Sequence, residues 1–339
     1  IINRLKKGKP YSIVVVAEGI PTIGGKKAAQ YIAEEIEYGV MPKNGYTKIP
    51  FISSSLDSEQ SLVTSNVLGL GRDPTTPFQD VINVSGDIVI PVDLRNFGIW
   101  LKAIFGSPTS KAITDDEEAL TGSYEHTFES GKVSLPSYAL EIGLPQVPEY
   151  IRFMGVKADS IAFNFQRSGE AQATVALLAQ GEDAAQTSIF TEAETKTYTR
   201  FSQFQGFIKN AGMRLANVTA ASLTYSNNLE KIETIRNDGK VEAIDVGVAG
   251  LSGSISVRYG DNELMNKARA GEPVDLEFGY ELSENQKLTI ICHEVYLPKP
   301  KRSISGPGGI ECSYDFQGAK EQTLGKMMTV ILINNEEAY

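Results

Sequence analysis

The chain is dominated by short runs in which apolar and polar residues alternate, from Tyr46 onward. In Ser160–Gln166 the apolar residues Ile161, Phe163 and Phe165 share one face, which is the pattern of a half-buried strand. Gly, Pro, Asn and Asp separate the runs, as expected of turns between strands. Further strands are predicted at Val84–Val92, Thr174–Ala179, Ala221–Tyr225, Gly253–Tyr259, Val274–Tyr280, Leu288–Cys292, Glu311–Phe316 and Thr329–Ile333. Many short strands with few helices indicate a mainly β fold, a sandwich or a barrel.

Three segments are predicted to be helices instead. Arg95–Phe105 and Asn262–Ala270 repeat their apolar residues at helical spacing, and each is followed by a glycine that would end the helix, Gly106 and Gly271. Ala28–Glu37 is rich in Ala, Gln and Glu, which favour helices, so a third helix is expected there.

Sequence motifs recur in the same order in the two halves of the chain. The first two pairs are 167 positions apart (222 − 55 and 251 − 84) and the third is 165 apart (267 − 102): Ser55-Leu56 with Ser222-Leu223, Val84–Ile88 with Leu251–Ile255, and Lys102-Ala103 with Lys267-Ala268. An ordered series of this kind predicts two tandem copies of one β-module, each with a flanking helix. We expect modules at residues 29–181 and 205–339, joined by a polar linker at residues 182–204.

Length and charge narrow the class of protein. The 339 residues suit two domains. Basic and acidic residues number 32 and 42, so the formal charge is −10, and the basic surface that grips nucleic acid is not expected. The longest apolar run, Ile13–Ala17, is far shorter than the ~20 residues of a membrane helix. The first residue is not Met and no secretory leader is recognisable, so a soluble protein made in the cytosol is expected.

No motif supports catalysis, cofactor binding or a metal site. The acidic run Asp115–Glu118 is interpreted as a solvated loop, because cation sites need oxygens spaced around a turn. In an alternating strand His293 faces away from Cys292 and Glu294, so these three cannot form a catalytic set. Leu68–Arg72 resembles part of a nucleotide loop but lacks the preceding strand and following helix. The basic turn Lys299–Arg302 is interpreted as solvated, and Ser305–Gly309 is interpreted as a loop.

The chain has two cysteines, Cys292 and Cys312. They could form a disulfide bridge but are interpreted as buried thiols.

Two segments, Thr64–Asp80 and Ser107–Thr127, are predicted to be unusually long loops. Loops of that length usually contact another molecule or are mobile.

Several motifs, in order, resemble those of bacteriophage major tail tube proteins. They are the opening Tyr31–Gly39, the strand Ile49–Ser55, the strand-and-helix element Val84–Gly106, and the mid-chain segments Phe201–Gly206 and Ser222–Leu229. The resemblance covers residues from about 28 to 339, about nine tenths of the chain. It implies a small β-sandwich flanked by a helix, with sheets set edge to edge around a ring that lines a channel.

The resemblance also implies a structural function without catalytic, cofactor-binding or metal residues. Since six modules would need only three chains, we expect trimeric rings with pseudo-six-fold symmetry, stacked into a hollow tube that conducts phage DNA. The implied partners are further copies, tape measure protein and DNA in the lumen, and terminator and distal tail proteins at the ends, with no membrane. The protein would lie in the virion tail after synthesis in the bacterial cytoplasm. An inner tube of a contractile tail or tailocin is the alternative.

The negative charge fits such a channel. DNA slides freely only where phosphate contacts are avoided, so Asp and Glu are expected to outnumber Lys and Arg on the lumen face. The two long loops are expected to make contacts between stacked rings.

The N-terminal segment, residues 1–28, has a different character and is basic. Arg4–Gly19 resembles a segment of bacterial 6-phosphofructokinases, in which the Glu matching Glu18 contacts the sugar phosphate. The ATP loop and the catalytic Asp loop of that family are missing, and a kinase cannot place ATP without the phosphate-cradling part. A sugar-phosphate kinase-related fragment is therefore kept only as a further alternative. Ile13–Ala17 is interpreted as a buried strand or an appendage.

Overall fold

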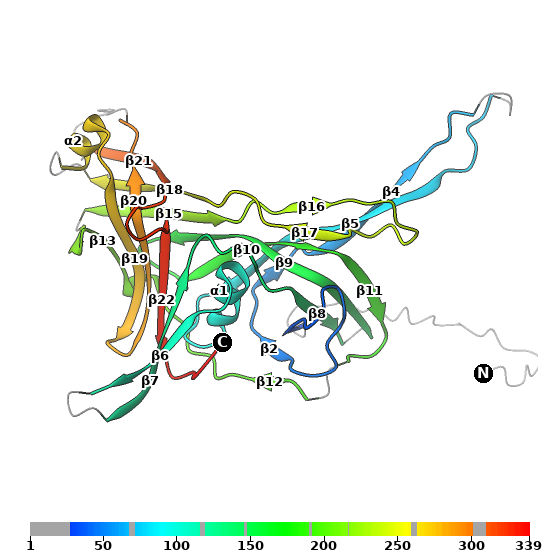
Figure 1. The fold of residues 1–339 in the computed structure, drawn as a ribbon, viewed down its shortest axis with the longest axis horizontal. Coiled ribbons are helices and arrows are strands. Elements are labelled where there is room, and N and C mark those ends of the chain that lie inside the picture. Colours follow the sequence, from blue (N-terminus) through cyan, green and yellow to red (C-terminus); the bar gives the residue numbers. More distant parts are fainter. Residues whose placement is uncertain are drawn as a thin grey trace, which may run out of the picture.

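The computed structural model describes residues 28–67, 72–115, 119–145, 148–189, 192–215, 217–258, 263–300 and 310–339. In this part of the chain the protein is mainly β, as the alternating sequence pattern predicts, and two α-helices lie among the strands (Figure 1). The predicted strand at Ile13–Ala17 lies outside the described residues.

One antiparallel layer, which we call the long sheet, runs through both halves of the sequence. In spatial order its strands are β4 (Asp57–Val63), β5 (Phe78–Pro91), β10 (Gln172–Ala179), β9 (Glu149–Phe165), β15 (Val218–Ser226), β18 (Gly250–Arg258) and β21 (Glu311–Gly318). The short strand β3 (Ser53–Ser54) pairs with β5 just before β4 does. The halves meet where β9 pairs with β15, with Phe163 opposite Leu223.

The second layer has one part in each half. In the first half its order is β12 (Glu194–Thr195), β2 (Thr47–Ile49), β1 (Ala29–Glu34), β8 (Tyr138–Leu144), the start of β9, and β11 (Gly181–Ala185). In the second half the order is β14 (Met213–Arg214), β13 (Gly206–Asn210), β19 (Val274–Ser283), β20 (Gln286–Tyr296), β22 (Met328–Asn334), β7 (Leu120–Glu129) and β6 (Thr109–Thr114). A separate pair, β16 (Glu230–Ile232) and β17 (Ala243–Asp245), follows β15.

Aromatic side chains fill the space between the layers. Phe278 of β19 packs at a tilt against Phe165 of β9, with ring centroids 5.3 Å apart, and stacks near Phe316 of β21, at 6.1 Å. These contacts join the second layer to the long sheet. One apolar cluster includes residues of both halves, so the two predicted modules share a core.

The two later helices are confirmed. Helix α1 (Phe97–Phe105) starts two residues after its predicted start, and α2 (Glu263–Ala270) follows its prediction closely. α1 is buried on most sides and presses Phe97 against Phe163 of β9, with ring centroids 6.0 Å apart. α2 buries only Leu264 and Met265, as expected of a helix on the surface.

The helix predicted at Ala28–Glu37 is wrong, because this segment forms strand β1. β1 pairs with β8 on one side and β2 on the other, which places Gln30 opposite both Ile142 and Ile49. Ladder hydrogen bonds on both edges and the burial of Ile32 outweigh the modest helix propensity of Ala, Gln and Glu.

The long loop predicted at Ser107–Thr127 is also wrong. It forms the hairpin β6–β7, and β7 then pairs with β22 of the second half. Most residues of β6 and of the start of β7 are exposed or half-buried, so they lack the apolar alternation by which a strand is recognised. The other predicted loop, Thr64–Asp80, lies in the connection of the hairpin β4–β5, and β5 begins within it, at Phe78.

The segment at residues 182–204 is not a plain polar connection. It contains most of β11, all of β12 and the start of a short 3-10 helix at Gln203–Gln205. Phe201 is fully buried, and Phe201 N–H donates to the Val92 carbonyl at 3.0 Å. This segment therefore contributes to the core of the protein.

The strands of the two halves pair in the same order. In the first half β1 pairs with β8, β8 with β9, β9 with β11, β4 with β5, and β5 with β10. In the second half β13 pairs with β19, β19 with β20, β20 with β22, β15 with β18, and β18 with β21. Helices α1 and α2 follow the matching strands β5 and β18. The hairpin β6–β7 is an addition to the first half.

Candidate assembly surfaces and channel face

The residues Cys292, His293 and Glu294 do not converge, as the strand alternation predicts. Cys292 is buried in the core, and burial raises the pKa of its thiol well above the ordinary range. His293 Nε2 lies 2.7 Å from Thr329 Oγ1, while the Glu294 carboxylate accepts the Tyr296 hydroxyl. A buried, protonated thiol without a base beside it cannot act as a nucleophile.

The remaining sequence motifs form no site in the described part of the chain. The Asp115 carboxylate accepts the Ala119 N–H at 2.9 Å, whereas residues 116–118, 68–71 and 301–309 lie outside the described residues. Both cysteines are free and buried, as predicted from the sequence. Among the described residues no group of three or more His, Cys, Asp or Glu could hold a metal ion. No described helix is long and apolar enough to span a membrane.

The side of the long sheet that faces away from the core carries small, mostly polar side chains. Across four neighbouring strands, Thr174, Ala162, Thr224 and Ser252 lie opposite one another in register. In the next row Ser222 Oγ lies 2.9 Å from Ser254 Oγ. Short hydroxyl side chains make most of this face polar, with Val89 of β5 and Leu178 of β10 as apolar exceptions.

Charged residues at outward positions of this polar face are mainly acidic. Asp57 lies opposite Ser85, Asp315 opposite Ser254, and Asp87 opposite Ala176. At one end Arg258 pairs in register with Glu311. The basic residues at outward positions are Arg258 and Lys157, which lies opposite Leu178, so acidic residues outnumber basic ones here, which weakens attraction for phosphate groups.

Among the described residues, one edge of the long sheet has no strand partner and the other has one over only two residue pairs. At one end, β4 pairs only with β5. At the other end, β21 pairs with β18 along its length but with β20 only at Val295 and Tyr296. Unpaired strand edges leave N–H and C=O groups free to pair with another chain.

Two hairpin arms leave the same end of the long sheet (Figure 1). The first arm, residues 57–82, comprises β4, the start of β5 and the connection between them, and the second arm, residues 227–249, joins β15 to β18 and contains β16 and β17. The arms touch where Ile82 N–H donates to the Gly239 carbonyl at 3.2 Å. Both expose large apolar side chains: Leu62, Val67, Phe78, Val81, Ile235 and Val248. Such a concentration of exposed apolar residues marks an interaction surface.

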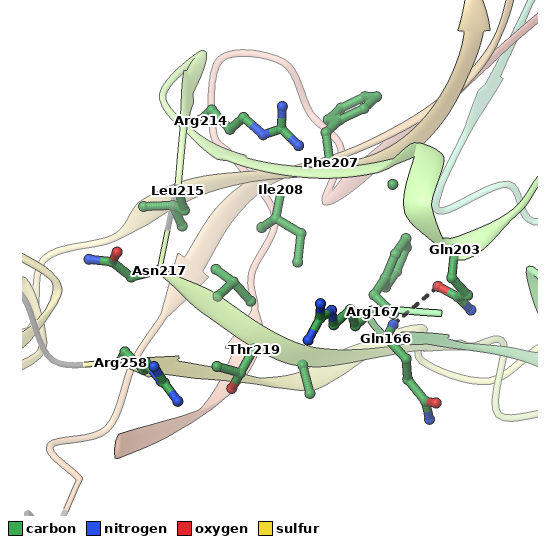
Figure 2. Close-up of a pocket in the computed structure, with 14 residues that line it drawn as sticks. Gln166, Arg167, Gln203, Phe207, Ile208, Arg214, Leu215, Asn217, Thr219 and Arg258 are labelled. Carbon is green, nitrogen blue, oxygen red and sulfur yellow. Dashed lines mark hydrogen bonds between the residues drawn. The ribbon is translucent and has the colours of Figure 1, made fainter. Parts of the chain in front are cut away.

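A cavity of about 520 Å³ lies at the other end of the long sheet (Figure 2). Arg167, Arg214 and Arg258 line it from three different strands or turns, and no acidic residue is among its lining residues. Ile208 of β13 supplies apolar surface inside it, whereas Phe207 points to the other side of β13 (Figure 2). We call this cavity the arginine pocket.

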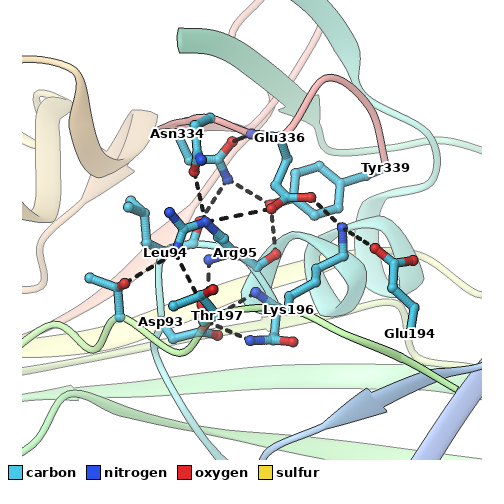
Figure 3. A network of polar contacts seen from close by, with 12 residues as sticks. Asp93, Leu94, Arg95, Glu194, Lys196, Thr197, Asn334, Glu336 and Tyr339 are labelled. Atoms are coloured by element: carbon cyan, nitrogen blue, oxygen red, sulfur yellow. Dashed lines mark hydrogen bonds and ion pairs between the residues drawn. The ribbon is translucent and has the colours of Figure 1, made fainter. Parts of the chain in front are cut away.

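A polar network fastens the C-terminal residues to the start of α1 (Figure 3). The Tyr339 hydroxyl donates to the Arg95 carbonyl at 2.6 Å, and Asn334 Nδ2 donates to the Leu94 carbonyl at 2.6 Å. Lys196 forms an ion pair with Glu336, which is also 3.6 Å from Arg95 Nε. Residues 194–199 and the last strand are thereby held together, so this cluster is structural.

Comparisons with known proteins give one long match and one short match. A 38-residue stretch, 11% of the chain, is 79% identical to ATP-dependent 6-phosphofructokinase 3 of Bacteroides thetaiotaomicron and covers 11% of that enzyme. The family model described as phage tail tube protein matches residues 25–318. The match covers most of the chain, including nearly every described strand, and the mainly β sandwich fits it. The protein therefore belongs to the phage tail tube protein family.

Proposed function

We propose that the protein is the structural subunit of a phage tail tube in which three chains form each ring. Each chain supplies two modules, so a ring has six modules and pseudo-six-fold symmetry. The observation that carries this proposal is the repeated order of strand pairing in the two halves. We infer that the protein acts by assembly and not by catalysis.

The internal duplication is supported by matching close contacts as well as by pairing. A Cβ on Gly86 would lie 2.3 Å from the Ser55 carbonyl oxygen, and a Cβ on Gly253 would lie 2.2 Å from the Ser222 carbonyl oxygen. These glycines and serines are the ones related by the constant sequence spacing (253 − 86 and 222 − 55 both give 167). The same steric requirement at the same position of each half is expected of two copies of one module.

The junction inside the chain supports a model for ring closure. There, β9 of the first module pairs with β15, the first long-sheet strand of the second module. The strands equivalent to β9 and β15 are β20 and β4. We propose that the β20–β21 end of one chain meets β4 of the next chain, repeating this junction. Three such contacts close the ring and cover both free edges of the long sheet.

The polar face of the long sheet would then line the channel. Its Ser and Thr side chains interact with water, and its charged residues are mostly acidic, so passing DNA would find few phosphate contacts. Six modules set side by side would make this face continuous around the lumen. The tape measure protein and genomic DNA are the proposed occupants, with terminator and distal tail proteins at the tube ends.

Stacking of rings would use the arms. The first arm projects beyond the body of the protein and exposes Leu62, Val67 and Phe78 (Figure 1). The hairpin β6–β7 is a second projection and exposes Leu120 near its tip. We propose that burying these apolar side chains on the next ring drives stacking.

The channel assignment can be tested by cysteine labelling, because both native cysteines are buried. Ser254→Cys places a thiol on the polar face, and the matched control Glu281→Cys places one on the outward side of β19 in the second layer. In assembled tubes, a small maleimide should label both variants. A maleimide attached to a protein too wide for the channel should label only Glu281→Cys. Equal labelling of both variants by the wide reagent would contradict a luminal polar face.

A further inference from the structure

We propose that Lys299 selects the neighbouring chain of a ring by forming a cross-strand ion pair with Glu59 of a second copy. This inference rests on the proposed three-chain ring and specifies the register in which two copies meet. The partner is chemically defined: an exposed strand edge that carries a carboxylate on the polar face of the long sheet.

The strand pairings fix which positions of the two modules correspond. Leu178 and Gln317 correspond, because their partners on β5 and β18 are 167 positions apart (252 − 85), the constant spacing of the duplication. Leu178 pairs with Lys157 of β9, and Gln317 pairs with Tyr296 of β20. Both residues of the second pair therefore lie 139 positions after those of the first (317 − 178 and 296 − 157). The same spacing relates the rest of β9 to the residues that follow β20.

Burial supports this alignment beyond the end of β20. β9 contains one extra residue, Asp159, because its ladder with β10 skips this position. After the buried Ala158 there are consequently two successive residues that are not buried. The same pattern follows the buried Leu297, since the next two residues, Pro298 and Lys299, are both exposed. The two segments therefore correspond residue by residue as far as Lys299.

The junction inside the chain shows what lies opposite this position. Ser160, the counterpart of Lys299 (299 − 160 gives 139), lies opposite Ser226 of β15. The counterpart of Ser226 on β4 is Glu59 (226 − 59 gives 167). A neighbouring chain that repeats the junction therefore places its Glu59 directly opposite Lys299. Ser160 is two residues from Ala162, so this pair would lie on the polar face.

The charges of the two positions are complementary, and both side chains are accessible. Lys299 and Glu59 are exposed, and neither forms an ion pair with a described residue. Residues directly opposite each other in an antiparallel pair have Cβ atoms about 4.5–5.5 Å apart, which brings an ammonium and a carboxylate within reach of each other. Like charges at such a position are destabilising, so two β20–β21 ends would repel each other here.

Two prolines flank the lysine, Pro298 and Pro300. Proline lacks an N–H group, and both proline and lysine are residues that blunt an exposed strand edge against unspecific pairing. Only Lys299 can donate a backbone hydrogen bond within residues 298–300. The backbone of this edge therefore offers little to an arbitrary strand, and the charge of Lys299 favours the acidic edge of β4.

Disulfide trapping in assembled tubes of the full chain tests the register. The variant K299C/E59C places two thiols opposite each other across the contact, and both native cysteines are buried. Diamide oxidises each facing pair of thiols to a disulfide and takes up their two hydrogen atoms. Most of the protein should then run as a covalent trimer on a non-reducing gel.

The matched control for trapping is K299C/S58C. Ser58 is the neighbour of Glu59 on β4, but it lies opposite the buried Val84 and so belongs to the core side of the strand. Its thiol should not reach residue 299 of the neighbouring chain. The control should therefore stay mostly monomeric under the same oxidation.

Charge reversal tests the selection itself. K299E and E59K alone each place like charges opposite each other, so each should need about fivefold more protein than the wild type to form tubes. K299E/E59K restores opposite charges and should assemble like the wild type, which also shows that both substitutions permit folding. K43E, at an exposed lysine between β1 and β2, is the control and should assemble normally. The readouts are light scattering and negative-stain microscopy.

Three results would overturn the inference. They are tubes of K299C/E59C that yield no disulfide between chains, equal cross-linking of K299C/E59C and K299C/S58C, and assembly of K299E/E59K that is no better than that of the single variants. A cross-linked product of six chains would support the register and contradict the three-chain ring. Failure of the inference and failure of the proposed function are therefore distinguishable.

Discussion

At the scale of single residues, Gly86 and Gly253 occupy places where a side chain does not fit. We expect Gly86→Ala and Gly253→Ala each to lower the free energy of unfolding by about 1–3 kcal/mol, because the new methyl group would overlap a neighbouring carbonyl oxygen. Gly250→Ala, on the same strand as Gly253, is the matched control, since its nearest atom outside the local chain is 3.6 Å away. Denaturant unfolding measures the difference. Equal stability of all three variants would show that the two contacts can relax at little cost.

His126 predicts a pH dependence of stability. Its Nε2 lies 2.9 Å from the Glu336 carbonyl oxygen and 3.2 Å from Asn334 Oδ1, so Nε2 carries the proton and Nδ1 accepts from Ser110. Burial lowers the pKa of His126 below its ordinary value of 6.5. The unfolded chain therefore takes up a proton first as the pH falls, and stability is lost below about pH 6.5.

The variant His126→Gln isolates this effect. Its melting temperature should fall less than that of the wild type between about pH 7.5 and about pH 5.5, since the titrating group is removed. The variant His293→Gln is the comparison. It keeps His126 and removes the other histidine, whose pKa is also lowered by burial. Parallel pH profiles for the wild type and His126→Gln would contradict the assignment.

At the scale of elements, the first arm is expected to be needed for stacking and not for folding. Its residues are mostly exposed, so deletion of Gly69–Pro77 removes little buried surface. The shortened protein should keep the melting temperature of the wild type within a few degrees, about 2–4 °C. It should not form tubes by electron microscopy. Tubes of normal length from this variant would show that stacking depends on other contacts.

The elements that were predicted correctly from the sequence are those whose apolar residues recur at a regular spacing. β5, β10, β18 and β19 alternate strictly enough to be recognised, and α1 repeats apolar residues around the helix. β1 was missed because its composition favours a helix and only its pairing with β8 and β2 makes it a strand. The hairpin β6–β7 was missed because it is stabilised by β22, a strand some 200 positions away in the sequence (329 − 129).

At the scale of the whole molecule, the predicted mainly β class and the tail tube family are confirmed, whereas the candidate assembly surfaces were identified only from the structure. Sequence motifs suggested a duplication, but only strand pairing shows which edge of the long sheet remains open in each half. The arginine pocket could not be predicted, because Arg167, Arg214 and Arg258 are far apart in sequence and are brought to one end of the molecule only by the β9–β15, β15–β18 and β13–β14 pairings. The polar face could not be predicted without the strand register either, because single Ser and Thr residues are common on strands.

The number of chains in one ring is the most direct test of the central claim that each chain supplies two equivalent modules. It can be measured by cryo-electron microscopy of assembled tubes. The predicted result is three chains per ring, with six similar modules around a lumen and β4 of each chain paired to the β20–β21 end of its neighbour. Six chains per ring, or a lumen lined by the second layer instead of the long sheet, would contradict it.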